Sequence, residues 1–291
     1  MRFRLLLRFA CLIFSFVGAS AQQPDRQAVL DALAKNGCTT LDTIKVCKYD
    51  YAFSGSNVEA ISFQPSGEGR FPGVILIPGY QRSAPDYLSL GTTLGKQGFA
   101  SLAITQPGFG RSTGKADYVG PGTIKALAEG FKKFQRESYV DADKMAVFGY
   151  SRGGMAASLL ATQLKDVRAA VFGAGVYDFK KAYDEMTIEG IRENMKLESG
   201  MTPQAIEERS SILHMKNLRA PVLILHGEKD VNVPVSQATA LRDKLIELKK
   251  DFEIRLFPEA AHGIATNEWM PLMISFLNRH LKGLNDPPKP Q

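Results

Sequence analysis

A five-residue segment, Gly149-Tyr150-Ser151-Arg152-Gly153, constrains this chain more than any other feature. The apolar run 144–148 before it is typical of a buried strand, and the run 154–161 after it favours a helix. A G-x-S-x-G pattern between a strand and a helix predicts a sharp, strained turn that exposes the serine at the end of a sheet. Ser151 is therefore a candidate nucleophile, although a glycine-rich turn with an incidental serine would carry the same letters.

A carboxylic acid and a histidine follow Ser151, each just after an apolar run. Asp230 lies beyond the run 221–226, and His262 lies in the loop after the run 252–257. Loops at the carboxyl ends of parallel strands gather at one edge of a sheet, so these three side chains should meet. The order serine, acid, histidine predicts a triad in which the histidine takes the serine proton and the acid orients the histidine.

One other residue competes for the role of the acid. Asp178 also follows a strand-like run and could be the acid, but the sequence around it favours a helix cap. His226 lies at a strand end, where we expect it to pack. The simpler alternatives are that Asp230 is a solvated turn residue and that His262 is an ordinary loop histidine.

Acyl transfer also needs backbone N–H donors for the developing oxyanion. One should be the N–H of Arg152, directly after the nucleophile. The other should come from the loop after the apolar run 73–77, where Tyr80 is the first candidate and Gln81 the second.

Three segments, 147–154, 209–234 and 257–263, resemble the α/β-hydrolase superfamily. Within it they are most similar to the catalytic domain of the prolyl oligopeptidase (S9) family and to dienelactone-hydrolase-like serine esterases. The resemblance spans about residues 70–283. It implies a serine hydrolase with Ser151, Asp230 and His262 as its triad, with no metal or organic cofactor.

The chain departs from these relatives in three ways. Pro78-Gly79-Tyr80 stands where many relatives have His-Gly-Gly, and Ser151 stands where dienelactone hydrolases proper have cysteine. The chain also leaves no room for the propeller domain of prolyl oligopeptidases, so their restriction to oligopeptides is not expected here.

The alternation of strand and helix patterns from Phe71 onward predicts a mostly parallel sheet with helices on both faces. The resemblance implies that this sheet belongs to an α/β-hydrolase fold. A helix over 22–37 and two antiparallel edge strands, 44–53 and 58–64, should precede it. Further strands are expected near 73–77, 99–104, 144–148, 168–173, 221–226 and 252–257, and helices near 84–97, 121–138, 152–164, 236–250 and 267–281.

The two ends are expected to lie outside the fold. A basic start, an apolar run and Ala19-Ser20-Ala21 predict a signal peptide over 1–21 that is cleaved after Ala21, hence a secreted or periplasmic protein. A retained membrane anchor is the alternative, but the apolar run is short for a span. We expect a single domain over 22–284 and a disordered tail over 285–291.

Cysteine content and charge agree with export. In an exported chain, Cys38 and Cys47 are predicted to form one disulfide. The alternative is that they are two reduced cysteines in the core. No further cysteine or histidine lies near them, so a metal site is not expected. Removing the signal peptide lowers the formal charge from +6 to +3, because Arg2, Arg4 and Arg8 leave with it. The sequence has no Lys/Arg-rich block, so nucleic acid is not an expected partner.

Two segments should shape the substrate site. The glycine-rich loop 105–114 lacks the lysine pattern of a P-loop and is interpreted as one wall of the cleft. The methionine-rich segment 178–217 is either a helical patch packed on the core or a small lid over Ser151. The side chains of Arg82, Arg111 and Arg152 either face the cleft or, as we prefer, are solvated surface charges.

The sequence thus predicts a secreted serine hydrolase that acts on a small ester or short peptide through an acyl-enzyme. Esters are favoured because their leaving groups need less assistance than amines. An S9-type peptidase for short peptides is the second hypothesis, and a non-catalytic binding module with the same fold is the third. The sequence does not predict an oligomeric state.

Overall fold

The computed structural model describes residues 26–284; the predicted signal peptide and the predicted tail lie outside this range. Its centre is a nine-stranded sheet in the order β1-β2-β5-β7-β6-β8-β9-β10-β11. These strands are β1 (Cys38–Leu41), β2 (Ile44–Lys48), β5 (Ala60–Gln64), β6 (Phe71–Ile77), β7 (Ala100–Ile104), β8 (Val140–Tyr150), β9 (Val167–Gly173), β10 (Val222–Gly227) and β11 (Phe252–Phe257).

The direction of the strands divides the sheet in two. From β7 to β11 all neighbours are parallel, whereas β1, β2 and β5 pair antiparallel at one edge. Apolar runs such as Val222–Gly227 are buried along their whole length, as expected for parallel strands covered on both faces. The predicted α/β-hydrolase architecture is confirmed.

The two predicted edge strands, 44–53 and 58–64, are each interrupted. A separate hairpin of β3 (Tyr51–Phe53) and β4 (Ser56–Val58) forms a second sheet. The backbone hydrogen bonds of the main sheet are interrupted here because side chains accept from two backbone N–H groups. The N–H of Ala60 donates to Asp50 Oδ1, and the N–H of Glu59 donates to Ser112 Oγ. Strand periodicity does not reveal such side-chain competition.

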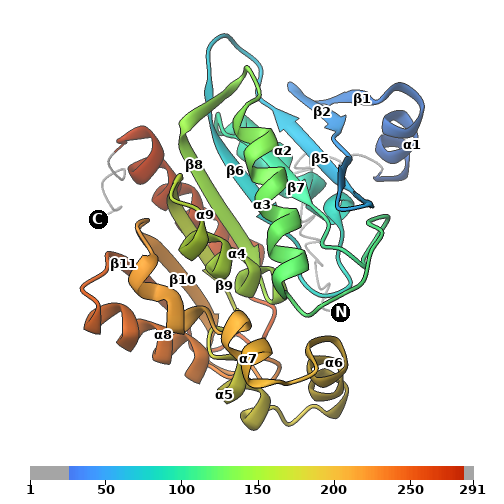
Figure 1. The fold of residues 1–291 in the computed structure, drawn as a ribbon. Helices are drawn as coiled ribbons and strands as arrows, with labels where there is room; N and C mark the ends of the chain where they lie inside the picture. Colours follow the sequence, from blue (N-terminus) through green and yellow to red (C-terminus); the bar gives the residue numbers. More distant parts are fainter. Residues whose placement is uncertain (1–25, 285–291) are drawn as a thin grey trace, which may run out of the picture.

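Helices cover both faces of the sheet (Figure 1). Helices α3, α4 and α8 pack their apolar sides on one core cluster, and α1, α2 and α9 pack on the other. The helices are α1 (Arg26–Asn36), α2 (Leu88–Lys96), α3 (Pro121–Gln135), α4 (Arg152–Gln163), α5 (Phe179–Glu185), α6 (Glu189–Ser199), α7 (Pro203–Arg209), α8 (Ser236–Glu247) and α9 (Thr266–Leu277), with short turns η1 (Ala84–Tyr87), η2 (Ser211–Asn217) and η3 (Asn278–Lys282).

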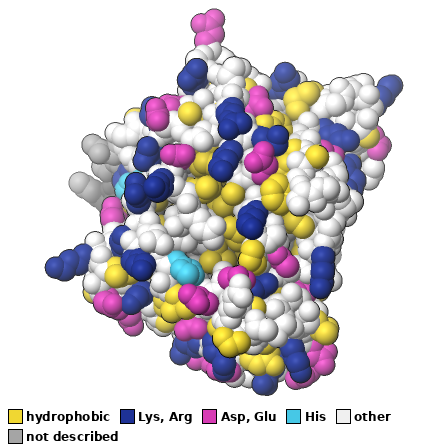
Figure 2. Space-filling model, viewed as in Figure 1, with side chains coloured by type: hydrophobic (Ala, Val, Ile, Leu, Met, Phe, Trp, Pro, Cys, Tyr) yellow, Lys and Arg dark blue, Asp and Glu magenta, His cyan; other side chains and the backbone are white. Residues whose placement is uncertain are grey.

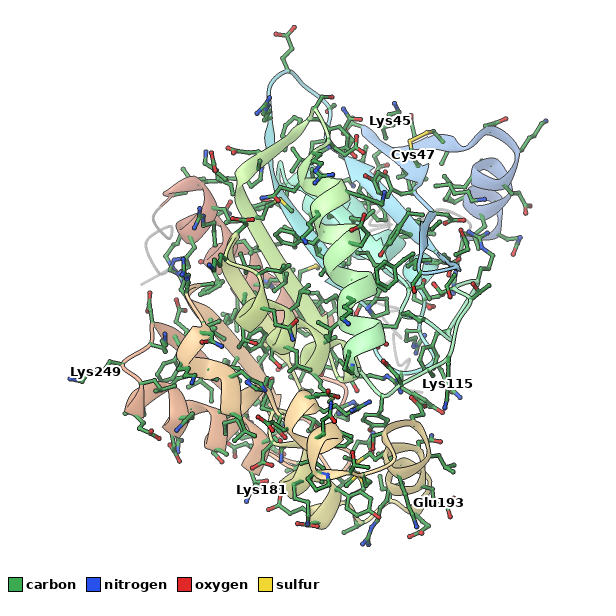
Figure 3. All side chains as sticks on the ribbon, viewed as in Figure 1. Lys45, Cys47, Lys115, Lys181, Glu193 and Lys249 are labelled. Atoms are coloured by element: carbon green, nitrogen blue, oxygen red, sulfur yellow. A yellow bond between two sulfur atoms is a disulfide. The ribbon has the colours of Figure 1, made fainter. Side chains whose placement is uncertain are left out.

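Cys38 and Cys47 form a disulfide that joins β1 to β2 at the antiparallel edge. Figure 3 shows this bridge at the opposite end of the molecule from Lys181 and Glu193, which belong to the inserted helices α5 and α6. The disulfide therefore links the two strands at the edge of the sheet and lies far from the inserted helices.

The face drawn in Figure 2 carries basic and acidic side chains interspersed. None of the helices within residues 26–284 combines the length and the apolarity needed to cross a membrane.

Candidate active site

Ser151 occupies the predicted sharp turn between β8 and α4. Its backbone lies in the left-handed region (φ 57°, ψ −124°), which is strained for a residue with a Cβ. A Cβ on Gly149 would lie 1.9 Å from the carbonyl oxygen of Gly153, and one on Gly153 would lie 2.0 Å from that of Ile77. Only glycine fits at either position, so the two motif glycines allow the close approach that exposes Ser151.

Ser151, His262 and Asp230 form a continuous chain of hydrogen bonds. The Nε2 atom of His262 lies 2.8 Å from Ser151 Oγ, and its Nδ1 atom lies 2.8 Å from Asp230 Oδ2. A carboxylate only accepts, so Nδ1 carries the proton and donates it, and the neutral ring accepts the Ser151 hydroxyl at Nε2. This is the arrangement in which an imidazole can remove a serine proton.

The backbone after β10 holds the Asp230 carboxylate in place. Its Oδ1 atom accepts the N–H groups of Asn232 and Val233, both at 2.9 Å, and its side chain is completely buried. Asp178, the alternative acid, instead caps α5 by accepting the N–H of Lys181 at 3.0 Å. The structure thus brings Asp230 to His262 and leaves Asp178 at a helix end.

His226 is a second histidine beside Asp230, at 3.4 Å from its Oδ2 atom. Its Nε2 atom donates to the carbonyl oxygen of Val233 at 2.9 Å, and burial lowers the pKa of the ring. His226 is therefore neutral near pH 7 and does not neutralise Asp230. The sequence predicted that it packs but gave no sign of its contact with the acid.

Tyr150 anchors the loop that carries His262, a role that sequence reasoning missed. Its hydroxyl donates to the carbonyl oxygen of His262 at 2.5 Å and accepts the N–H of Ile264 at 3.1 Å. Burial raises the pKa of Tyr150 to about 12, so the hydroxyl stays protonated. Tyr150 occupies a variable position of the G-x-S-x-G motif, so the motif itself carries no signal for this contact.

The two residues expected to supply the oxyanion N–H groups, Arg152 and Tyr80, both line the cavity with Ser151. Arg152 is the first residue of α4, so its N–H has no acceptor within the helix. A Cβ on Gly79 would lie 3.4 Å from the Ser151 Cβ, so the residue that precedes Tyr80 packs against Ser151. The N-terminal end of α4 also adds partial positive charge.

The Arg152 side chain is buried, contrary to our expectation of a solvated surface charge. Its Nη2 atom donates to Glu198 of α6 at 2.7 Å, and its guanidinium carbon lies 4.8 Å and 4.7 Å from the ring centres of Phe109 and Tyr118. An acidic partner and aromatic faces compensate the desolvated cation. Sequence periodicity could not identify Glu198, which lies 46 positions away.

Arg111 does not line the cavity; it pairs with Glu59 at 3.1 Å and with Asp50 at 3.7 Å. Arg82 lines the rim of the cavity and remains largely exposed.

A cavity of about 800 Å³ opens at Ser151 and His262. Met186, Ile191 and Asn194 of the inserted segment form part of its wall, so this segment contributes to the site. The loop 105–114 does not line this cavity, and our interpretation of it as a wall was wrong. Its Gln106 and Phe109 contact the Arg152 side chain, which stands between the loop and the cavity.

No group of three or more His, Cys, Asp or Glu side chains within the described residues could hold a metal ion.

A family model for the prolyl oligopeptidase family matches residues 112–284, which include Ser151, Asp230 and His262. The chain belongs to the prolyl oligopeptidase family. It is thus a serine hydrolase of that family, as the sequence resemblance implied.

The proteins that resemble this chain in sequence are peptidases, and those that resemble it in fold include both peptidases and esterases. The uncharacterized peptidase YtmA of Bacillus subtilis is 29% identical over 225 residues, which are 75% of this chain and 86% of that protein. The fold is similar to that of an acylaminoacyl peptidase from Pyrococcus horikoshii (TM-score 0.74, 17% identity, 85% of this chain and 43% of that chain). It is also similar to that of an acetyl xylan esterase from Paenibacillus sp. R4 (TM-score 0.72, 18% identity, 84% of this chain and 87% of that chain).

This chain therefore spans less than half of the acylaminoacyl peptidase but most of the acetyl xylan esterase.

Proposed function

We propose that this protein hydrolyses small carboxylic esters through an acyl-enzyme on Ser151. The observation that carries the proposal is the continuous hydrogen-bond chain Ser151–His262–Asp230 at the mouth of the cavity. The strained turn at Ser151 and the two neighbouring N–H groups support the same chemistry.

In the proposed reaction, Ser151 Oγ attacks the ester carbonyl carbon while its proton passes to His262 Nε2. The carbonyl oxygen becomes an oxyanion between the N–H groups of Tyr80 and Arg152. His262 then gives the proton to the departing alkoxide, and the acyl group remains on Ser151. Water repeats the sequence in the second half, its proton passing to His262 and then back to Ser151. Asp230 orients the ring and stabilises its charged form throughout.

Two considerations favour esters over peptides. An alkoxide leaves more readily than an amine, so less assistance from His262 is required. The acetyl xylan esterase from Paenibacillus matches this fold over 87% of its own length. The second candidate is a serine peptidase for short peptides, which the peptidase YtmA and the acylaminoacyl peptidase from Pyrococcus favour.

We also propose that the mature protein is exported after cleavage behind Ala21. The disulfide between Cys38 and Cys47 supports this, because such bonds persist mainly in oxidising compartments.

The proposal is tested with a fluorophosphonate probe and two sets of chromogenic substrates. We expect the probe to label Ser151, and short acyl esters to be turned over faster than peptide amides. Turnover of amides alone would favour the peptidase, and absence of label on the folded protein would favour a non-catalytic binding module. Asp230→Asn should lower kcat by about 10⁴-fold, whereas the matched variant Asp178→Asn should barely change it. The reverse result would move the acid to Asp178.

A further inference from the structure

The cavity beside Ser151 extends over both faces of the sheet. On the face covered by α2 and α9, six lining residues belong to or pack on the core cluster beneath these helices. We call these six residues the aromatic arm: Tyr87, Leu90, Phe148, Ile264, Trp269 and Met270. On the other face, the cavity lining includes residues that belong to or pack on the core cluster beneath α3, α4 and α8: Tyr118, Met155, Val176 and Ile191. A substrate at Ser151 thus meets two apolar regions that the sheet edge separates.

The aromatic arm is built on a buried pair of stacked rings. The rings of Phe148 and Trp269 stack with their centres 5.2 Å apart and their planes 13° apart, and Tyr87 packs on Phe148 at 6.4 Å. Leu90 and Met270 are only partly buried and offer apolar surface at the cavity. Such a surface favours another flat apolar group, because aromatic rings gain from stacking and methionine adapts its shape to a ring.

The aromatic arm lies on the His262 side of Ser151. Ile264 follows His262 by two residues, Tyr150 hydrogen-bonds the backbone of both, and the same segment continues into α9 with Trp269 and Met270. His262 must protonate the leaving-group oxygen, so the leaving group must lie next to its Nε2 atom. The acyl group then extends away from it, toward the face that carries Met155 and Val176.

We propose that the aromatic arm binds the leaving group, and that the preferred substrates are esters of uncharged aromatic alcohols. This inference rests on the proposed acyl transfer at Ser151. The six side chains of the arm carry no formal charge near pH 7, whereas Arg82 and Asp86 at the cavity wall form an ion pair at 3.6 Å. The inner part of the arm therefore selects an apolar ring.

The test compares benzyl acetate with methyl acetate, which share the acyl group and release alcohols of nearly equal acidity. We expect kcat/KM to be about 10- to 100-fold higher for the benzyl ester, as burial of one ring implies. Leu90→Asp and Met270→Asp should each lower this ratio toward one, mainly through a higher KM for the benzyl ester. Leu272→Asp is the matched control, since Leu272 lies exposed on α9 outside the cavity lining, and it should keep the ratio.

Inhibition gives a second measurement that needs no variant. Benzyl alcohol should inhibit methyl acetate hydrolysis competitively at concentrations where methanol has no effect. A benzyl-to-methyl ratio near one in the unmodified protein, or an unchanged ratio in folded Leu90→Asp, would overturn the aromatic arm while Ser151 still reacts with fluorophosphonate. If Ser151 takes no label and neither ester is cleaved, the proposed function itself fails, and the arm with it.

Discussion

Ser151 projects from the sheet because glycines lie two positions before it and two and three positions after it. Besides the two motif glycines, a Cβ on Gly154 would lie 2.6 Å from the carbonyl oxygen of Gly173. The N–H of Ser151 donates to that same carbonyl group at 2.8 Å, which ties the turn to β9. Strain at one residue is thus held by contacts with two strands, as expected where a reactive side chain must be positioned.

Tyr150 should control the position of His262 without touching the substrate carbonyl. Tyr150→Phe removes the hydroxyl that joins the His262 carbonyl oxygen to the N–H of Ile264, so the loop loses its anchor. We expect kcat to fall about 10- to 100-fold with little change in KM, because small displacements of His262 would be costly if it acts as the proposed base. Steady-state kinetics on a chromogenic acyl ester measure this.

Tyr49→Phe is the matched control for that variant. Its hydroxyl donates to Glu137 at 2.6 Å, and neither residue lines the cavity at Ser151. The control should keep kcat; an equal loss in both variants would mean that Tyr150 acts through general stability.

At the scale of elements, polar contacts attach the inserted helices to the site. Glu198 of α6 accepts from Arg152 and from the N–H of Tyr118, and Arg209 of α7 donates to the carbonyl oxygen of Asp117 at 2.6 Å. Asn194 of α6 also donates to the hydroxyl of Tyr80 at 2.9 Å. The segment is therefore fastened to both sequence regions that carry the candidate oxyanion donors.

Removing Glu198 should leave the Arg152 cation buried without its partner. We expect Glu198→Ala to lower the free energy of unfolding by about 3 kcal/mol, at the low end for a broken buried pair because 17% of the Glu198 side chain is exposed. Urea denaturation measures this, and adding Arg152→Leu should recover part of the loss. Glu193→Ala, an exposed site on the same helix, should change stability little. Equal stability of Glu198→Ala and Glu193→Ala would contradict a stabilising role for the pair.

At the scale of the whole molecule, the sheet and its two helical layers bury the side chains of Asp230 and His226. Asp230 and His226 lie at the end of β10, a strand buried over its full length, so their environment forms only when the layers close around it. The ionisation of His226 is thereby coupled to global folding.

His226 should make the fold sensitive to acid. Its pKa is lowered by burial in the folded protein and is near 6.5 in the unfolded chain, so the unfolded chain binds more protons on acidification. The stability that its neutral form contributes is present above about pH 6.5 and is lost as the pH falls toward the folded pKa. We expect Tm to fall between pH 7 and pH 5, and His226→Gln to make this fall shallower. His214→Gln, at a partly exposed site, should keep the slope of the unmodified protein; the same slope in His226→Gln would refute the coupling.

Local patterns were sufficient for the fold class and for the three linked side chains. The G-x-S-x-G turn, the buried parallel strands and the loops after β10 and β11 each depend on residues adjacent in the chain, and the carboxyl ends of parallel strands bring such loops together. The broken edge strands, the contact of His226 with Asp230, the Tyr150 anchor and the buried Arg152–Glu198 pair were decided only by tertiary structure. These contacts join residues 4 to 114 positions apart, and whether a polar side chain is solvated or paired depends on which distant group the packed layers place beside it.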